Sequence, residues 1–448
     1  MGEHPTESGC SAQPAGAAPV LDPAAISSAR WFAGKGREIA DATPADALAV
    51  PGGDGASLLL VDVTSTAGDV ERYLVPVSRD GVLLEAEACE HALWPALAHC
   101  ITSGGRIEGV AGAVEARPGT DTIVVPPGAR GLTPDQSNTS VVLGESLVLK
   151  CYRRLEPGTH PEPEVLAALS GIDCRVAPSY AGSLVYRDRE GRETDLALLY
   201  GYVDGTPVGW EAIIASLTAR LGSPDAEALV EEAGALATAA AALHVALGEA
   251  LGVVRASADD AARLEDDAHR QLDEALAALA PDDPLHALSP HARRRLQGLR
   301  RLTGAPLTRV HGDLHVAQFV RSPHGLVAVD FEGEPGRPLE QRRLRTSPLR
   351  DLACLLLSLD HVAVAAARRH AFEPAMLAAA QAWSSAAREH ALERYAAATA
   401  GIGLVVDRDL LRAFEVEKEC RELLYAATVL PEWLYAPQAT LPRLLGVT

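Results

Sequence analysis

The pattern of apolar positions changes near residue 206 of this 448-residue chain. Before that point, short runs rich in β-branched and aromatic residues, such as 57–61 and 72–77, predict strands. After it, apolar residues recur with the period of a helix. Helices are expected over residues 226–251, 258–280, 350–369, 373–398 and 408–428. The pattern therefore predicts an α+β chain in which the sheets come first and the second half is mostly helical.

Two strand pairs are predicted ahead of the helical half. Residues 140–143 and 147–150 are β-rich apolar runs joined by a short polar turn, which is typical of a hairpin. Residues 184–186 and 196–200 form the second pair.

Acidic and amide side chains gather in two short segments, residues 310–318 and 329–335. Asp313 is followed by Gln318 five residues later and by Asp330 seventeen residues later. A protein kinase uses the same order of groups: the first Asp takes the proton of the attacking hydroxyl, while an amide and a second Asp hold magnesium. The spacing predicts a kinase-type phosphotransferase, although Gln318 replaces the Asn of a protein kinase.

The same residues allow other interpretations. An Asp after a Gly is usually a turn residue, and the acids could form a structural salt-bridge cluster or belong to a non-catalytic sugar or nucleotide sensor. His311, Asp313 and His315 could also ligate a metal for hydrolysis if they lay at alternate positions of a strand. A glycine among them favours a loop. Residues 327–329 indicate a buried strand, so Asp330 at its end needs a metal or hydrogen bonds, which favours catalysis.

Lys150 ends the predicted hairpin. A kinase lysine on such a strand contacts the nucleotide phosphates and pairs with a Glu on the next helix. Residues 161–166 are expected to open that helix, with Glu164 as the partner. Residues 135–140 stand where a glycine-rich loop is expected, and their hydroxyl and amide side chains could donate to phosphate oxygens or form an ordinary loop.

Several motifs together resemble one family. They are residues 30–37, 136–140, 149–155, 311–315, 330–335 and 347–351. In this order, from about residue 28 to Trp433, they look like the actinobacterial maltokinases and their glucosamine kinase relatives, which belong to the aminoglycoside-phosphotransferase-like kinases. The resemblance implies a bilobal fold like that of eukaryotic protein kinases, with an added N-terminal sheet-containing cap. It also implies ATP and Mg²⁺ as cosubstrates and a sugar hydroxyl as acceptor.

The resemblance also implies roles for individual residues. Asp313 would be the base, Gln318 and Asp330 the magnesium ligands, and Lys150 with Glu164 the pair that clamps the phosphates. Glu332, where a protein kinase has Gly, would join the metal or cap a turn. The remaining expected nucleotide contacts are Gln136, Ser137, Asn138, Thr139 and Ser140, together with the hinge backbone near Tyr200 and Tyr202.

The expected division follows from the same motifs. Residues 1–27 would be a disordered tail and 28–95 the cap. Residues 96–205 would form the N-lobe with the nucleotide-binding hairpin and hinge, and 206–448 the helical C-lobe with the catalytic and sugar-binding residues.

The acceptor is predicted from the helix expected over residues 408–428, which departs from the maltokinase pattern. Glu415, Glu419 and Glu422 fall at i, i+4 and i+7, so three carboxylates share one face. Such stacking costs about a few tenths of a kcal/mol per pair unless a cation lies among the carboxylates. A protonated amino sugar is one candidate cation, and Lys418 and Arg421 on neighbouring faces of the helix are the other; the acidic face could also simply be solvated.

We therefore expect phosphorylation of glucosamine to glucosamine 6-phosphate, with maltose to maltose 1-phosphate as the alternative. His315 and Trp433 are further candidate contacts to the sugar, and Trp210 is a weaker candidate because Trp residues more often pack in the core or at its rim.

Composition agrees with an intracellular enzyme. The net charge of −20 argues against nucleic acid as a partner, because phosphate backbones attract basic surfaces. Seven scattered cysteines contain no Cys-x-x-Cys pair, which disfavours a disulfide framework. The first residues lack a basic-then-apolar signal pattern. We expect a cytoplasmic monomer without a membrane span.

Overall fold

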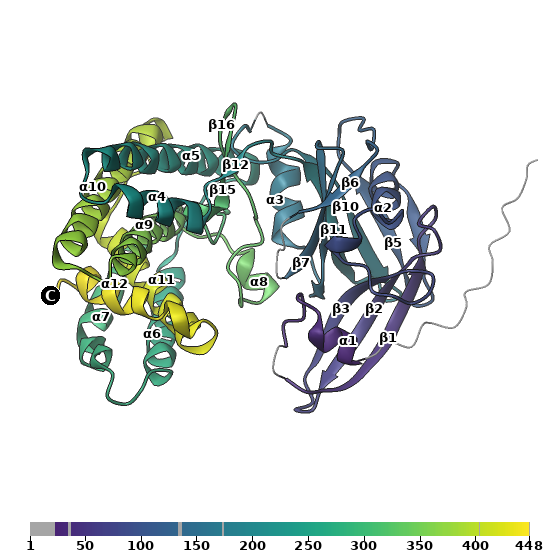
Figure 1. The fold of residues 1–448 in the computed structure, drawn as a ribbon, viewed down its shortest axis with the longest axis horizontal. Helices are drawn as coiled ribbons and strands as arrows, with labels where there is room; N and C mark the ends of the chain where they lie inside the picture. Colours follow the sequence, from purple (N-terminus) through teal and green to yellow (C-terminus); the bar gives the residue numbers. More distant parts are fainter. Residues whose placement is uncertain (1–22, 35–36, 133–136, 173, 403, 448) are drawn as a thin grey trace, which may run out of the picture. The chain divides into compact units, whose positions relative to one another are not determined.

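The structure is a computed structural model that describes residues 23–34, 37–132, 137–172, 174–402 and 404–447. It divides into two compact units (Figure 1). The first comprises Met1–Thr159 and Ala181–Tyr200, and the second comprises His160–Tyr180 and Gly201–Thr448. The boundaries predicted at residues 95 and 205 stay predictions. The tail predicted over 1–27 falls mostly on residues outside the described ranges.

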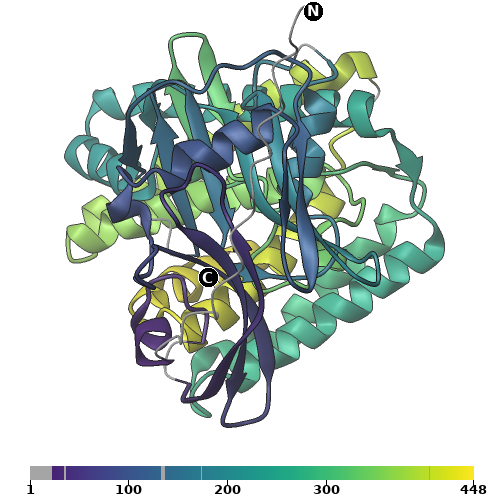
Figure 2. The same ribbon diagram turned by 90° about the vertical axis from the view of Figure 1, so that its right-hand side faces the viewer.

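The first part of the first unit is a four-stranded antiparallel sheet, in the order β1-β2-β3-β9 (Figure 2). Its inward positions are apolar, and the ring of Tyr73 packs at 5.7 Å from Trp31 and 5.5 Å from Phe32. These aromatic contacts close a small core between the sheet and the segment before it. The elements are α1 (Pro23–Ser28), β1 (Ile39–Ala49), β2 (Ser57–Ser65), β3 (Val70–Val77) and β9 (Arg154–Leu155).

A seven-stranded sheet completes the first unit, in the order β4-β5-β10-β11-β8-β7-β6, with α2 packed on β5. The predicted hairpin is confirmed, because β7 pairs antiparallel with β8 and Ser140 lies opposite Lys150. The predicted second pair is confirmed as the neighbours β10 and β11. The elements are η1 (Ala86–Ala88), α2 (Leu93–Thr102), β4 (Arg106–Glu108), β5 (Gly112–Pro118), β6 (Ala129–Gly131), β7 (Asn138–Leu143), β8 (Leu147–Tyr152), β10 (Tyr180–Asp188) and β11 (Glu193–Gly201).

The second unit is mostly helical and is organised around α9, which packs against α4, α5, α10, α11 and α12. All five helices predicted from the helical period are confirmed within a few residues. The helices are α3 (Pro161–Leu169), α4 (Trp210–Arg220), α5 (Glu227–Leu251), α6 (Ala258–Ala277), α7 (Ser289–Leu296), α8 (Leu339–Arg342), α9 (Leu349–Arg369), α10 (Pro374–Thr399), α11 (Arg408–Thr428) and α12 (Tyr435–Leu445).

Short elements connect these helices and position the loops between them. The strands form the sheet β12-β15-β16 and the pair β13-β14. The strands are β12 (Thr206–Pro207), β13 (Val254–Arg255), β14 (Pro306–Leu307), β15 (Phe319–Ser322) and β16 (Gly325–Ala328). The 3-10 helices are η2 (Pro224–Ala226), η3 (Pro284–Leu288), η4 (Gln297–Leu302), η5 (Val316–Gln318), η6 (Ala400–Ile402) and η7 (Pro431–Trp433).

One helical stretch, Pro224–Leu251, is long and apolar enough to cross a membrane by length and composition. Slightly more than half of its most apolar window, 56%, is buried inside the protein. The core helix of a globular protein has the same properties, so the stretch is weak evidence for a membrane span.

Candidate active site

Asp313 lies in the loop between β14 and η5, and this loop is fastened to the first turn of α9. The backbone N–H groups of His311 and Gly312 donate to the two carboxylate oxygens of Asp351, at 2.8 and 2.9 Å. Burial alone would raise the pKa of Asp351, but the hydrogen bond and charge of His244 with these backbone donors lower it instead. A buried carboxylate therefore fixes the backbone immediately before Asp313.

A second loop crosses the first at close range. Gly312 has φ +91°, and a Cβ built there would lie 3.1 Å from the Cα of Gly333. Only glycine combines this left-handed backbone with such an approach. The Nε2 of His311 lies 2.9 Å from the carbonyl oxygen of Val329, and its ring packs 4.8 Å from that of Phe331. The segment is a loop rather than a strand, so the alternate spacing that a histidine metal site requires is absent here.

Asp330 and Gln318 are neighbours in the structure, as their order in the sequence led us to expect. The Nε2 of Gln318 donates to Oδ2 of Asp330 at 3.3 Å. Asp330 follows β16 and has φ +69°, an uncommon conformation that is concentrated at functional sites. The backbone N–H of Val329 donates to the carbonyl of Gln318 at 2.9 Å, so the two side chains are held by paired backbones.

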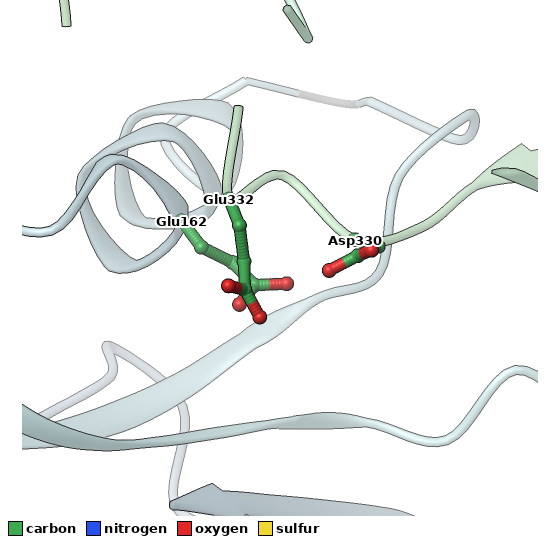
Figure 3. A group of neighbouring side chains, drawn as sticks. All are labelled: Glu162, Asp330 and Glu332. Carbon is green, nitrogen blue, oxygen red and sulfur yellow. The ribbon is translucent and has the colours of Figure 1, made fainter. Parts of the chain in front are cut away.

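Three carboxylates converge next to this pair (Figure 3). Glu162, Asp330 and Glu332 each offer an oxygen, and these oxygens lie within 4.8 Å of one another. Glu162 comes from α3, and its Oε1 accepts a hydrogen bond from the backbone N–H of Phe331 at 3.2 Å. Carboxylate and amide oxygens are the donors that Mg²⁺ prefers. The donor set fits the magnesium expected from the sequence, and it adds Glu162, which the sequence analysis missed.

The two acids of α3 have different surroundings. Its first turn is set by the N-cap His160, whose side chain accepts from the backbone N–H of Glu162, and by prolines in that turn. Glu164 binds Arg309 at 2.5 Å and Arg343 through both carboxylate oxygens at 2.9 and 3.0 Å. Burial would raise the pKa of Glu164, but the hydrogen bonds from Arg343 and Arg309 lower it. The predicted pairing of Glu164 with Lys150 stays a prediction, since Lys150 belongs to the first unit.

The residues predicted to bind nucleotide begin at the start of β7. Asn138, Thr139 and Ser140 are buried strand residues, whereas Gln136 lies outside the described ranges. Nε of Arg153 donates to the Thr139 hydroxyl at 2.8 Å. Ser137 precedes the strand, and its Oγ accepts from Asn138 at 3.3 Å.

The predicted hinge lies at the end of β11. Tyr200 is the last residue of the first unit, and Tyr202 follows in the second. Their proposed contact with an adenine ring stays a prediction.

On its other side, Asp313 meets α11. The Nζ of Lys418 lies 3.0 Å from Oδ1 of Asp313 and 2.8 Å from Oε1 of Glu422. Burial alone would lower the pKa of Lys418, but the carboxylates of Asp313 and Glu422 outweigh it and raise this pKa well above the usual value. Asp313, the predicted base, and one of the predicted sugar-binding acids are thus joined by one ammonium group.

Aromatic rings line the neighbourhood of the base. Trp210 packs 5.2 Å from the ring of His315 and 6.1 Å from that of Trp433. Trp433 is 6.5 Å from the ring of His361. His315 Nε2 is 3.8 Å from Oδ2 of Asp313. The structure therefore brings Trp433 and His315, both predicted contacts of the sugar, into one cluster with Trp210.

Glu415, Glu419 and Glu422, the three predicted sugar-binding acids of α11, each pair with a different partner. Oε1 of Glu415 binds Arg388, and its Oε2 lies 3.0 Å from Arg412. Each of the other two meets a different cation, Glu419 at 3.1 Å from His361 and Glu422 at 2.8 Å from Lys418. These partners come from α10 (Arg388), from α9 (His361) and from α11 itself (Arg412 and Lys418). Of the partners of these three acids that the described residues supply, Lys418, the partner of Glu422, is the one that also contacts Asp313.

A buried ionic network ties the loop after Asp330 to the same helices. Arg350 Nη2 lies 3.1 Å from Glu334 and 3.2 Å from Glu417. Arg421 and Arg337 contact the same two carboxylates. Burial would raise the pKa of Glu334, but the surrounding arginines lower it strongly. The network connects α9, α11 and the loop that carries Asp330.

Comparison with known proteins finds similar kinases. Residues 26–107 match the family model of the maltokinase N-terminal cap domain. A glucosamine kinase of Streptacidiphilus jiangxiensis is 32% identical over 395 residues, covering 85% of this chain and 87% of that protein. A glucosamine kinase of Mycolicibacterium smegmatis is 32% identical over 325 residues, covering 71% and 80%.

A solved structure gives the same result for the fold. A glucosamine kinase in complex with glucosamine, ADP and inorganic phosphate superposes with a TM-score of 0.70 at 28% identity, covering 95% of this chain and 97% of the other. The predicted α+β kinase-like fold, with a cap and a helical second part, is confirmed.

Proposed function

We propose that this chain, which belongs to the glucosamine kinase family, transfers the γ-phosphoryl group of ATP to glucosamine and yields glucosamine 6-phosphate. One observation carries the proposal. The loops of Asp313 and Asp330 cross at Gly312 and Gly333, and Gln318 reaches Asp330 there. This arrangement supports phosphoryl transfer to a hydroxyl group. The similarity to glucosamine kinases supports glucosamine as the molecule that carries this hydroxyl.

Asp313 is the proposed base. The acceptor hydroxyl oxygen attacks the γ-phosphorus, the bond from this phosphorus to the bridging oxygen of ADP breaks, and the hydroxyl proton passes to Asp313. The hydrogen bonds from His311 and Gly312 to Asp351 keep the loop in place during this step. Orientation of the hydroxyl is a large part of the catalysis, because phosphoryl transfer depends mainly on positioning and electrostatics.

Gln318 and Asp330 would hold magnesium, with Glu332 and Glu162 as neighbouring donors. When bound, the ion offsets negative charge on the phosphate oxygens. Gln318 and Asp330 need little rearrangement for this task, since their backbones are already paired through Val329.

ATP would be bound by groups that the family resemblance assigns. Residues 136–140 would donate to phosphate oxygens, and Lys150 with Glu164 would clamp the phosphates. The backbone near Tyr200 and Tyr202 would hold the adenine ring.

The sugar would lie against Trp433 and His315, with its ammonium group attracted by Glu422 and Glu419. Glucosamine is a cation at neutral pH, so carboxylates near the sugar would favour it over a neutral sugar. Glu422 shares Lys418 with Asp313, and Glu419 lies 3.1 Å from His361, which packs near Trp433. We do not assign Glu415 to the sugar, because two arginines bind its two carboxylate oxygens. Glu422, in contrast, pairs through one oxygen with Lys418, and Glu419 pairs with one histidine ring. Maltose stays the alternative acceptor, supported by the match of residues 26–107 to the maltokinase cap. We propose a cytoplasmic enzyme, where ATP is available.

A coupled assay with ATP and magnesium tests the acceptor. Glucosamine, glucose, N-acetylglucosamine and maltose are compared at equal concentration. We expect the highest turnover with glucosamine and a much lower one with N-acetylglucosamine, which has the same ring but no positive charge. A preference for maltose contradicts the amino-sugar assignment, and turnover with none of the four contradicts a kinase acting on these sugars.

A further inference from the structure

We propose that Lys418 is a positioning residue, which fixes the carboxylate of Asp313 so that Oδ2 accepts the proton of the acceptor hydroxyl. The inference rests on the proposed function, since it assigns a task within that reaction. The proposal gives different roles to the two carboxylate oxygens of Asp313, Oδ1 and Oδ2, which the sequence motif does not distinguish.

The first support is that Oδ1 of Asp313 already has protein donors as partners. Lys418 Nζ lies 3.0 Å from this oxygen, and the thiol of Cys354 donates to it at 3.9 Å. Lys418 comes from α11 and Cys354 from α9, so two helices direct hydrogen-bond donors at the same atom. An oxygen that already accepts from an ammonium group is a weaker base than its partner, because that contact stabilises negative charge on it.

The second support is the surroundings of Oδ2. Within the part of the chain that the structure describes, Oδ2 of Asp313 has no hydrogen-bond donor in reach, and His315 Nε2 lies 3.8 Å away. His315 in turn packs on Trp210. The oxygen that lacks a protein donor thus faces the aromatic cluster where the sugar is proposed to lie, and it has the geometry expected of the base atom.

The third support is the way in which Lys418 itself is held. Its side chain is 10% exposed, and Glu422 at 2.8 Å and Glu334 at 3.8 Å flank it together with Asp313. Glu334 is anchored by Arg350 at 3.1 Å. A charge with three carboxylates around it has little freedom to move, so it transmits the rigidity of α11 to the Asp313 side chain.

Anchoring of α11 alone does not require this lysine. The same helix is tied to α10 through Glu415 and Arg388, and to α9 through Glu417 and Arg350 at 3.2 Å. Contact with the base is what distinguishes Lys418 from these pairs.

The test uses the full-length protein with glucosamine and ATP. Lys418→Met keeps the volume of the stem and removes the charge. We expect kcat to fall about a hundredfold with KM for ATP changed less than about twofold, which is the pattern of a group that acts in the transition state. Arg412→Met, which removes a cation of the same helix that pairs with Glu415, is the matched control and leaves kcat within about twofold.

Two further measurements separate positioning from a structural role. In an Asp313→Ala background, Lys418→Met should lower the residual rate no further. Both substitutions would remove the same function, which is proton acceptance by a correctly oriented Asp313 carboxylate. Lys418→Ala, in which a small space replaces the stem, should regain at least about tenfold in kcat with added methylamine, while Asp313→Ala regains nothing.

Lys418→Met with kcat like that of the unmodified chain overturns the inference, as does additivity with Asp313→Ala. A Lys418→Ala protein that folds and is not rescued by methylamine also overturns it. If the unmodified chain does not phosphorylate glucosamine, the proposed function fails first and the inference falls with it. Turnover by the unmodified chain together with an unaffected Lys418→Met overturns the inference alone.

Discussion

The two crossing loops and the helix α11 both contribute to the site, and they differ in how their residues are arranged. Asp313, Gln318 and Asp330 lie on short segments whose backbones hydrogen-bond to each other. On α11, in contrast, the acids pair with side chains from several helices, such as Glu415 with Arg388 of α10 and Glu422 with Lys418 of α11 itself. The loops therefore encode the chemistry locally, whereas the acceptor side is determined by tertiary partners. Phosphoryl transfer can be recognised from spacing, and the choice of sugar cannot.

The largest effect is expected from Asp313→Ala. Removal of the base should lower kcat by about three powers of ten while ATP binds nearly as before, because the group acts mainly in the transition state. Steady-state kinetics and calorimetric titration with ATP measure the two quantities. Asp409→Ala, at an exposed position in the first turn of α11, serves as a control without effect. Retained turnover in Asp313→Ala contradicts the assignment of the base.

On the side of the two crossing loops, Glu162 and Glu164 of α3 form a matched pair that tests which acid lies beside the metal. Glu162→Gln should raise the magnesium concentration needed for half-maximal activity by about tenfold or more, because it removes a carboxylate beside Asp330. Glu164→Gln should leave that concentration within about twofold, since its carboxylate binds Arg309 and Arg343. Activity as a function of magnesium concentration gives both values. The reverse order of effects would place Glu164, rather than Glu162, beside the metal.

On the acceptor side, Glu422 and Glu415 form the matched pair. Glu422→Gln should raise KM for glucosamine by about tenfold or more with little change for glucose, because it removes a charge that attracts the ammonium group. Glu415→Gln should leave both KM values unchanged and lower stability by about 3 kcal/mol, since Arg388 loses a buried carboxylate. Kinetics with both sugars and thermal unfolding separate the two outcomes. Equal changes in KM for both sugars in Glu422→Gln argue against charge recognition.

The smallest effect concerns the pair of His361 and Glu419, which lies next to Trp433. Burial would lower the pKa of His361, but Glu419 at 3.1 Å outweighs it and raises this pKa. Burial also raises the pKa of Glu419. A group whose pKa is higher in the folded state stabilises the fold below its unfolded pKa, and this stability is lost as pH rises through the folded value.

Thermal stability should therefore decline as pH rises above about 6.5, the ordinary pKa of a histidine, and the decline should be shallower in His361→Gln. Melting temperatures measured between about pH 6 and pH 9 for both proteins test this. Parallel curves would mean that the pair does not gain a proton on folding.

Much of the fold and of the loops could be predicted from the sequence, because their signals are local. The hairpin that ends near Lys150, the five long helices and the strand before Asp330 follow from periodicity over a few residues. The distinction between Glu162 and Glu164 could not be predicted. Both are acids in one helical turn, and what separates them is Arg309 and Arg343, which lie 145 and 179 residues from Glu164 along the chain.

The same limit applies to Lys418 and to the three acids of α11. Lys418 contacts Asp313 across 105 residues, a separation at which no motif spacing signals a contact. The three acids Glu415, Glu419 and Glu422 lie on one helix as expected, but Arg388 and His361, which pair with two of them, come from other helices. Periodicity indicates which residues share a face, and packing decides what that face meets.

The central claim is that Asp313 directs the γ-phosphoryl group of ATP to glucosamine. Phosphorus NMR of a reaction with equal amounts of glucosamine and maltose tests it most directly, because the two products are different phosphate esters. Besides the signals of ADP, we predict the signal of one sugar phosphate, glucosamine 6-phosphate, which Asp313→Ala does not produce. A signal of maltose 1-phosphate, or the same product formed at an undiminished rate by Asp313→Ala, would contradict it.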